Sequence, residues 1–204
     1  MKRTFAVAAL ALGLSGCGMM HSMMHGDGDA KWTTLFDGRS LDNFTPIGDA
    51  NWRLQDGAVV ADKGSGFLVT KETYGDVEIR AEFWADDDAN SGVFVRCEDR
   101  TKLTSDNCYE FNIFDKRPVA IYGTGAIVDT GKVLVTPLPK AGGRWNTYEI
   151  VAKGDHLMVK MNGVKTAEAH DAKHARGAIG LQYAPGVVKD KGVIKFRKVE
   201  IRPL

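Results

Sequence analysis

The strongest candidate for chemistry in this sequence is a glutamate inside a short apolar segment. Glu110 alternates with Tyr109 and Phe111, so in a β-strand its carboxylate points to the face opposite the two aromatic rings. Asn112 shares the face of the carboxylate. A carboxylate held on such a face can act as a general base toward a bound molecule. The plain alternative is a solvated glutamate that pairs with a neighbour on the surface.

Arg96 is the second candidate, at the end of an apolar segment that precedes the first of two neighbouring cysteines. Its guanidinium offers five fixed donors for the oxygen atoms of a ligand, and the alternative is a salt bridge to Glu98 or Asp99. Its position relative to Glu110 depends on strand register. If the two cysteines lie directly opposite each other, Arg96 and Glu110 lie on opposite faces, and a β-bulge or a disulfide outside the ladder would remove the conflict.

Seven further side chains could contact a ligand, namely Asn90, Ser91, Asn112, Asp115, Tyr122, Trp145 and Gln182. Asn90 and Ser91 precede a predicted strand, and their alternative role is to form a turn. The aspartate and the tyrosine flank the loose segment 116–143, and a long loop in a compact domain is usually functional or mobile. The tryptophan could stack on a ligand ring or belong to the core, and the glutamine lies in a predicted strand.

Metal binding has weak support in the sequence. The acidic segment 86–88 could attract a cation, but the full calcium-loop pattern is absent, so a solvated acidic turn is the simpler interpretation. His170 and His174 have the spacing of two ligands on one helix face, yet the residues between them are polar and favour a loop or turn. We therefore predict no metal site and no cofactor, and leave a divalent metal as an open alternative.

Short apolar segments separated by turn residues predict an all-β domain that would position these side chains. In residues 77–83, apolar side chains alternate with charged ones, which is typical of a half-buried strand. Residues 157–161 run into Asn162-Gly163, a strong hairpin signal. The sequence shows no long helical pattern and no internal repeat. These features predict that residues 31–204 form a β-sandwich or jelly roll of antiparallel strands.

The N-terminus predicts export and lipid attachment. Two basic residues precede an apolar run over 5–14 that is too short to span a bilayer, and small residues then lead to Cys17. The Leu-Ser-Gly-Cys tetrad resembles a bacterial lipobox, which implies a signal peptide over 1–16 and lipidation of Cys17. An ordinary signal peptide cut nearby is the alternative. Glycine after this cysteine, in place of aspartate, favours the outer membrane within the cell envelope.

The segment after the signal peptide, the net charge and the hydropathy limit the kinds of partner that we expect. Residues 17–30 predict a flexible tether, and their methionines and histidines could also bind a soft metal such as copper. The formal net charge is +1, and lysines and arginines are scattered rather than gathered into a stripe, so no nucleic-acid partner is expected. No apolar run after the signal is long enough to span a membrane, so we expect membrane contact through the lipid anchor alone.

Cys97 and Cys108 are predicted to form a disulfide. Export places them in an oxidising compartment, where an even pair is expected to bridge. A metal pair or a catalytic thiol is the alternative, but no third or fourth ligand stands at zinc spacing.

Several motifs, in order along the chain, resemble the 3-keto-disaccharide hydrolase family, also described as domain of unknown function 1080. They are residues 32–44, 90–96, 109–113, 143–149, 162–163, 179–182 and 196–197. Each motif alone is weak, and their common order makes the resemblance specific over about residues 32–202.

The resemblance implies a fold like that of concanavalin-like lectins and glucanases, with two antiparallel sheets and a sugar site on the concave one. It also implies cleavage of glycosides whose sugar carries a ketone at C3. A base removes the proton on C2, the C1 substituent leaves by elimination, and water can then add.

Carried onto this chain, the resemblance implies that Glu110 is the base and that Arg96 binds the enolate oxygen or a hydroxyl group. Asn112 stands where the family commonly has glutamine, so its amide reaches one methylene less far. A carbohydrate is the expected partner. The competing hypothesis is a non-catalytic, glycan-binding lipoprotein on the same sandwich, because a fold does not fix a function.

Overall fold

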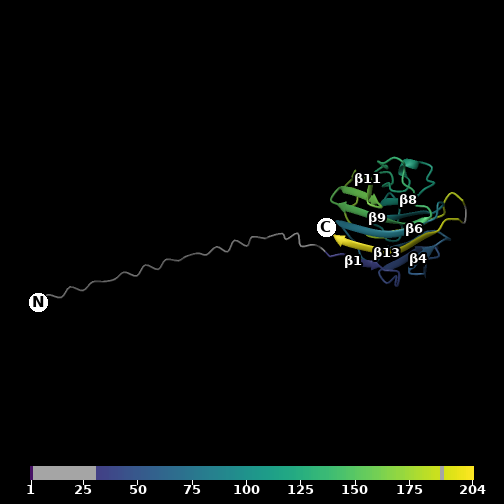
Figure 1. Ribbon diagram of the computed structural model, residues 1–204. Helices are drawn as coiled ribbons and strands as arrows, with labels where there is room; N and C mark the ends of the chain where they lie inside the picture. Colours follow the sequence, from purple (N-terminus) through teal and green to yellow (C-terminus); the bar gives the residue numbers. More distant parts are fainter. Residues whose placement is uncertain (2–30, 189–190) are drawn as a thin grey trace.

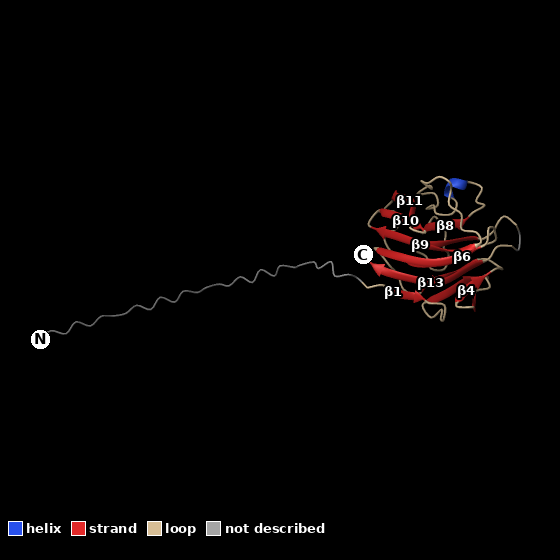
Figure 2. Cartoon of the chain, in the orientation of Figure 1, coloured by secondary structure: helices blue, strands red, loops and turns tan. Residues whose placement is uncertain are grey.

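Two antiparallel β-sheets packed face to face form the fold and confirm the predicted β-sandwich (Figures 1 and 2). The structure, a computed structural model, describes residues 1, 31–188 and 191–204. The predicted signal peptide, the predicted lipidation site Cys17 and the predicted tether thus lie outside the described residues, apart from Met1. Within the described ranges, no helix has the length and apolar character needed to cross a bilayer.

Sheet A has eight strands in the order β11-β10-β9-β6-β13-β4-β3, with β1 also paired to β13. Their bounds are β1 (Thr33–Phe36), β3 (Arg53–Gln55), β4 (Ala58–Ala61), β6 (Val77–Ala85), β9 (Arg144–Lys153), β10 (His156–Met161), β11 (Val164–His170) and β13 (Ile194–Pro203).

Sheet B has five strands in the order β2-β5-β12-β7-β8. Their bounds are β2 (Phe44–Gly48), β5 (Gly66–Thr70), β7 (Asn90–Cys97), β8 (Tyr109–Phe114) and β12 (Ala178–Tyr183). In the described part of the chain the helical element is a short 3-10 turn, η1 (Ala120–Tyr122), in the loop after β8.

Alternation along each strand decides which side chains form the core between the sheets. Four side chains of β6 are fully buried there: Val77, Ile79, Ala81 and Phe83. The charged residues between them lie on the outer face of sheet A. In β8, Tyr109 and Phe111 belong to the same core. Glu110 and Asn112 therefore point away from sheet A, on what we call the outer face of sheet B.

The loop between β7 and β8 covers part of this outer face. Leu103 packs with Phe94 and Val69 in a second apolar cluster, separate from the core between the sheets. It lies directly on the backbone of β12, because a Cβ at Gly180 would approach Leu103 Cδ2 to 2.3 Å. The loop thus covers one end of the outer face next to Glu110.

A disulfide joins Cys97 and Cys108 at the base of this loop, with 11 residues of sequence separation. We expect the double variant Cys97→Ser/Cys108→Ser to lose about 3 kcal/mol of unfolding free energy, because a loop of this length gains conformational entropy in the unfolded chain. Urea unfolding followed by circular dichroism measures the loss. The single variants should show the same loss as the double variant, and an unchanged midpoint would contradict the prediction.

Candidate functional site

Glu110 lies on β8, the last strand in the order of sheet B, with its side chain on the outer face beside an aromatic ring. Strand pairing places it opposite Phe94, whose side chain is 1% exposed, while Glu110 itself is 8% exposed. The neighbouring position on β7 is Gly92, and a Cβ there would lie 3.4 Å from both Glu110 Cγ and Phe94 Cε2. Gly92 therefore leaves room for the glutamate stem and the ring to pack together.

Burial gives this carboxyl unusual acid–base properties. The pKa of Glu110 is raised to about 7, mainly by loss of solvation; the charge of Arg117 opposes this rise and the charge of Asp129 adds to it. Among the described residues, no hydrogen bond or ion pair fixes the carboxyl. A carboxyl that is half ionised near neutral pH and has no partner within the protein suits proton transfer to or from a ligand.

Two side-chain amides share the outer face with Glu110. Asn112 is fully buried, and its Nδ2 donates to the carbonyl oxygen of Tyr122 at 2.7 Å, which fixes the orientation of the amide. Asn112 of β8 pairs with Gly92 of β7. On the other side of β7, Leu181 of β12 pairs with Val93, so the next residue, Gln182, lies beside Gly92.

Both amide oxygens, Asn112 Oδ1 and Gln182 Oε1, are buried and accept no hydrogen bond within the described structure. An unpaired buried acceptor costs free energy that a donor would recover. Hydroxyl groups are donors of the kind that these oxygens require. Substrate hydroxyls would reach them only if the covering segments move, because both atoms are shielded from solvent.

The segment after η1 lies alongside β8 and holds the site in place. Asn112 exchanges backbone hydrogen bonds with Gly125 and Ala126, and Val128 N donates to the carbonyl oxygen of Glu110 at 2.9 Å. Tyr148 of sheet A donates its hydroxyl to the carbonyl oxygen of Asn112 and accepts from Gly125 N. β8 is therefore hydrogen-bonded on both edges, which fixes its two polar side chains in position.

Arg96 does not join this site, and the structure corrects the expected catalytic role to a structural one. Its side chain is 1% exposed, and its donors are used by the protein. Nε donates to the carbonyl oxygen of Gly75 at 3.2 Å, and Nη1 donates to those of Gly154 at 2.7 Å and His174 at 3.1 Å. Nη2 donates to Asp76 Oδ1 at 2.9 Å. Arg96 thus ties sheet B to the ends of sheet A strands.

A β-bulge explains why Arg96 turns inward. Glu110 pairs with Phe94, so strict alternation would place Arg96 on the same outer face as the glutamate. The pairing of β12 with β7 shifts by one residue between Ala178 and Gly180, and Arg96 adopts a φ of 56° there. The extra residue turns the guanidinium away from the outer face of sheet B and toward the ends of the sheet A strands. Arg96 and Glu110 thus point to opposite faces of sheet B, as one of the two expected registers implied. The β-bulge is the cause of this arrangement, whereas the sequence analysis expected a bulge to bring the two side chains to the same face.

Three further predicted residues make side-chain contacts within the protein. Ser91 is fully buried and donates to the backbone oxygen of Gln182 at 2.6 Å, and Asn90 donates to the carbonyl oxygen of Pro185. Asp115 accepts from the backbone amides of Ala141 and Gly142 and closes the long loop. These contacts are internal to the protein, so the three side chains hold the scaffold.

Trp145 lies on the outer face of sheet A, in β9, and Tyr122 reaches the site through its backbone oxygen. The structure therefore brings together Glu110, Asn112 and Gln182. It also adds Phe94, Arg117 and Asp129, which the sequence analysis did not select. Phe94 shares the strand face of Glu110 and could have been found from alternation, whereas the two loop residues leave no pattern in the sequence.

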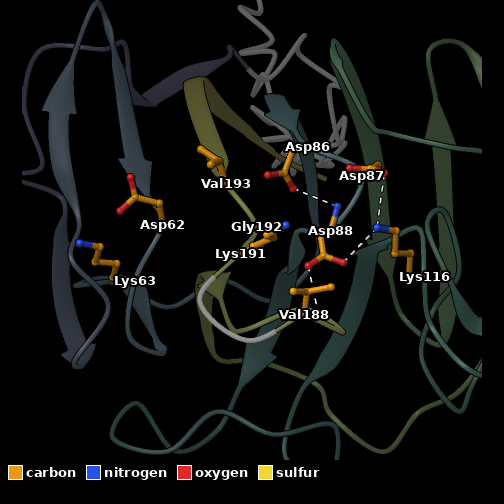
Figure 3. Close-up of a pocket in the computed structure, with 10 residues that line it drawn as sticks. All are labelled: Asp62, Lys63, Asp86, Asp87, Asp88, Lys116, Val188, Lys191, Gly192 and Val193. Atoms are coloured by element: carbon orange, nitrogen blue, oxygen red, sulfur yellow. Dashed lines mark hydrogen bonds and ion pairs between the residues drawn. The ribbon is translucent and has the colours of Figure 1, made fainter.

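A cleft of about 570 Å³ lies elsewhere, at the turn between β6 and β7 (Figure 3). Its charged lining residues are Asp62, Lys63, Asp86, Asp87, Asp88, Lys116 and Lys191. Lys116 Nζ lies 3.1 Å from Asp88 and 3.3 Å from Asp87, and Val188 N also donates to Asp88. Since protein groups already occupy the most buried carboxylate, we do not assign this cleft to the chemistry of Glu110.

The comparison with protein families identifies the chain. Residues 31–202 match the 3-keto-alpha-glucoside-1,2-lyase-like domain. The chain belongs to this family. A comparison with curated proteins finds no match. Family membership gives the chain a glycoside-related function.

Solved structures similar to the chain support the fold. A candidate glycosyl hydrolase from Parabacteroides distasonis is 28% identical, with a TM-score of 0.67, over 85% of this chain and 100% of that one. A second candidate glycosyl hydrolase from the same organism is 18% identical, with a TM-score of 0.72, over 85% of this chain and 94% of that one. The carbohydrate-binding module CBM66 from Bacillus subtilis is 14% identical, with a TM-score of 0.56, over 85% of this chain and 96% of that one. This likeness shows the jelly-roll fold alone.

The raised pKa of Glu110 predicts a stability that depends on pH. Because the folded-state pKa of about 7 exceeds the ordinary value of 4.5, the folded protein holds this proton more tightly than the unfolded chain. Stability should therefore fall as pH rises from 4.5 to 7 and stay level above it. Glu110→Gln removes the buried charge and should raise the unfolding free energy at pH 8 by up to about 3 kcal/mol, with little effect at pH 4.

Urea unfolding midpoints of wild type and Glu110→Gln, measured between pH 4 and pH 8, test this prediction. Glu149→Gln, on a strand of sheet A, is the matched control and should show no gap that widens with pH. Equal midpoints for wild type and Glu110→Gln at pH 8 would contradict a buried charge at this position.

Proposed function

We propose that the protein cleaves 3-keto-glycosides by elimination, with Glu110 as the base that removes the proton on C2. The observation that carries the proposal is the buried Glu110 carboxyl on the outer face of sheet B. It has a pKa raised to about 7 and no partner among the described residues. Membership of the 3-keto-alpha-glucoside-1,2-lyase-like family supplies the substrate class.

The chemistry requires one proton acceptor and no oxidant. A ketone at C3 acidifies C2, and the Glu110 carboxylate takes the C2 proton as the electron pair moves into an enolate. The C1–O bond then breaks, a C1=C2 double bond forms, and the leaving oxygen takes a proton from the Glu110 acid or from water. Addition of water across the double bond would complete a net hydrolysis.

The neighbours of Glu110 have roles that fit this reaction. Asn112 Oδ1 and Gln182 Oε1 can accept hydrogen bonds from sugar hydroxyls, since both lack donors in the structure. The positive charge of Arg117 acts on Glu110 and would stabilise negative charge that develops on the enolate oxygen. Arg117 takes the role that the sequence suggested for Arg96.

The test is to incubate the protein with a 3-keto disaccharide in D₂O and to follow the products by mass spectrometry. Elimination predicts release of the free sugar together with an unsaturated keto sugar, or with a hydrated product that carries deuterium on C2. Release without deuterium on C2 and without an unsaturated product would overturn the elimination. Absence of any release would overturn the enzymatic function.

A glycan-binding protein is the second candidate, and one observation favours it. In the described part of the chain, no second carboxyl forms a hydrogen bond with Glu110, so an acid for the leaving group is not preassembled. Binding of the 3-keto disaccharide by calorimetry without turnover, in the wild type, would support this function.

A further inference from the structure

A second set of aromatic side chains lies on the outer face of sheet A, away from Glu110. Trp84 of β6 pairs with Trp145 of β9, and Lys195 of β13 pairs with Trp84, so the three residues form one row across the sheet. These strands lie side by side in Figure 1. Trp145 is 37% exposed, so part of its ring faces solvent.

A hollow of about 250 Å³ separates Trp145 from the hairpin formed by β3 and β4. Its lining residues are Gln55, Asp56, Ala58, Val60, Trp145 and Lys195. Ala58 and Val60 are buried, whereas Gln55 at the end of β3 and Asp56 in the hairpin turn are exposed. The hollow therefore has an apolar floor, one aromatic wall and a polar rim.

Neighbouring contacts hold both walls in place before any ligand arrives. The Arg197 guanidinium lies 4.3 Å from the centre of the Trp145 ring, and its Nε donates to Glu82 at 2.5 Å. Across the hollow, Arg53 binds Asp62 through two hydrogen bonds of 3.2 and 2.6 Å at the base of the hairpin. A preformed site of this kind loses little conformational entropy on binding.

The chemistry of the lining selects the kind of ligand. The rim carries one amide, one carboxylate and one ammonium group, so its formal charge is zero, and neither an anionic nor a cationic ligand is favoured. A flat aromatic wall with adjacent donors and acceptors suits a molecule that has an apolar ring face and hydroxyl groups on its edge. A neutral pyranose ring has both features.

We propose that this hollow is a second carbohydrate site, which binds one ring of a neutral glycan against Trp145. It is separate from the proposed activity of Glu110, because Trp145 lies on the outer face of sheet A and Glu110 on that of sheet B. A glycan held there leaves the face of Glu110 free. Trp145 is then a ligand contact, as the sequence suggested, but at a different site.

The experiment is isothermal titration calorimetry of the full chain with neutral tetrasaccharides of glucose in α-1,4, β-1,3 and β-1,4 linkage. We expect Trp145→Ala to weaken binding of whichever tetrasaccharide binds the wild type by about tenfold or more. Gln55→Ala, at the exposed end of β3, should weaken it without affecting folding. Trp32→Ala is the matched control, because the Trp32 ring lies 4.1 Å from the Arg80 guanidinium and does not line the hollow. This variant should bind as the wild type does.

The outcomes are distinct from those that test Glu110. Loss of binding in Trp145→Ala and its retention in Glu110→Gln support a second site, whether or not the protein has turnover. If none of the tetrasaccharides binds the wild type, or if Trp145→Ala and Gln55→Ala both bind as the wild type does, the proposal is wrong. Loss of binding in Glu110→Gln alone would also overturn it, because the sugar would then occupy the face of sheet B.

Discussion

Glu110→Gln is expected to lower the rate of 3-keto-glycoside cleavage by about 10²- to 10⁴-fold, which is the range that a positioned general base contributes. The amide keeps the shape of the side chain and its packing against Phe94, but it cannot accept a proton. Sugar hydroxyls would still meet the oxygens of Asn112 and Gln182. The loss should therefore appear in kcat, with a smaller change in KM.

The pH dependence of the wild-type rate checks the same assignment. The base must be ionised, and burial raises the pKa of Glu110 to about 7. The value of kcat/KM for the wild type should then rise with pH through about 7 and level off above it. An ordinary surface glutamate would instead be fully ionised well below pH 6.

Two results would contradict the role of Glu110. One is a Glu110→Gln variant that turns over at the wild-type rate. The other is a rate that stays constant between pH 5 and pH 8, since the carboxyl would then not titrate in the reaction. Glu149→Gln is the control, and it should retain the wild-type rate and pH profile.

Arg96→Lys is expected to lower the unfolding free energy by about 3 kcal/mol. Lysine keeps the charge but has one donor nitrogen, so it cannot replace four hydrogen bonds that leave Arg96 from three different nitrogens. The carbonyl oxygens of Gly75, Gly154 and His174 would lose their bonds to the arginine at the point where the two sheets meet. The substitution leaves the left-handed backbone in place, because lysine and arginine share the same backbone preference.

Urea unfolding measures this loss, and Arg39→Lys is the matched control. Arg39 is 87% exposed in its side chain and lies 3.9 Å from Asp37, so its replacement should change stability by less than about 1 kcal/mol. If Arg96→Lys is as stable as the wild type but loses turnover, the assignment of Arg96 to the scaffold is wrong, and a role in the reaction returns.

The sequence by itself determined the face of Glu110 and the class of the fold. Alternation in 109–113 places the carboxylate and the Asn112 amide opposite the aromatic rings, because successive side chains of a strand point to opposite sides. The same rule predicted β6, and turn residues between short segments predicted the sandwich. These features depend on neighbours in the chain, so local patterns are enough to find them.

Only the tertiary structure decided which residues meet. Trp145 and Glu110 both lie in strands, but sheet order places them on opposite outer faces. Arg96 is two residues from Phe94, yet one bulge turns its guanidinium away from Glu110 and into the junction of the sheets. The raised pKa of Glu110 likewise depends on its burial and on the charges of Arg117 and Asp129 in the loop after β8. Register, bulges and burial arise from contacts between distant segments, and no local pattern encodes them.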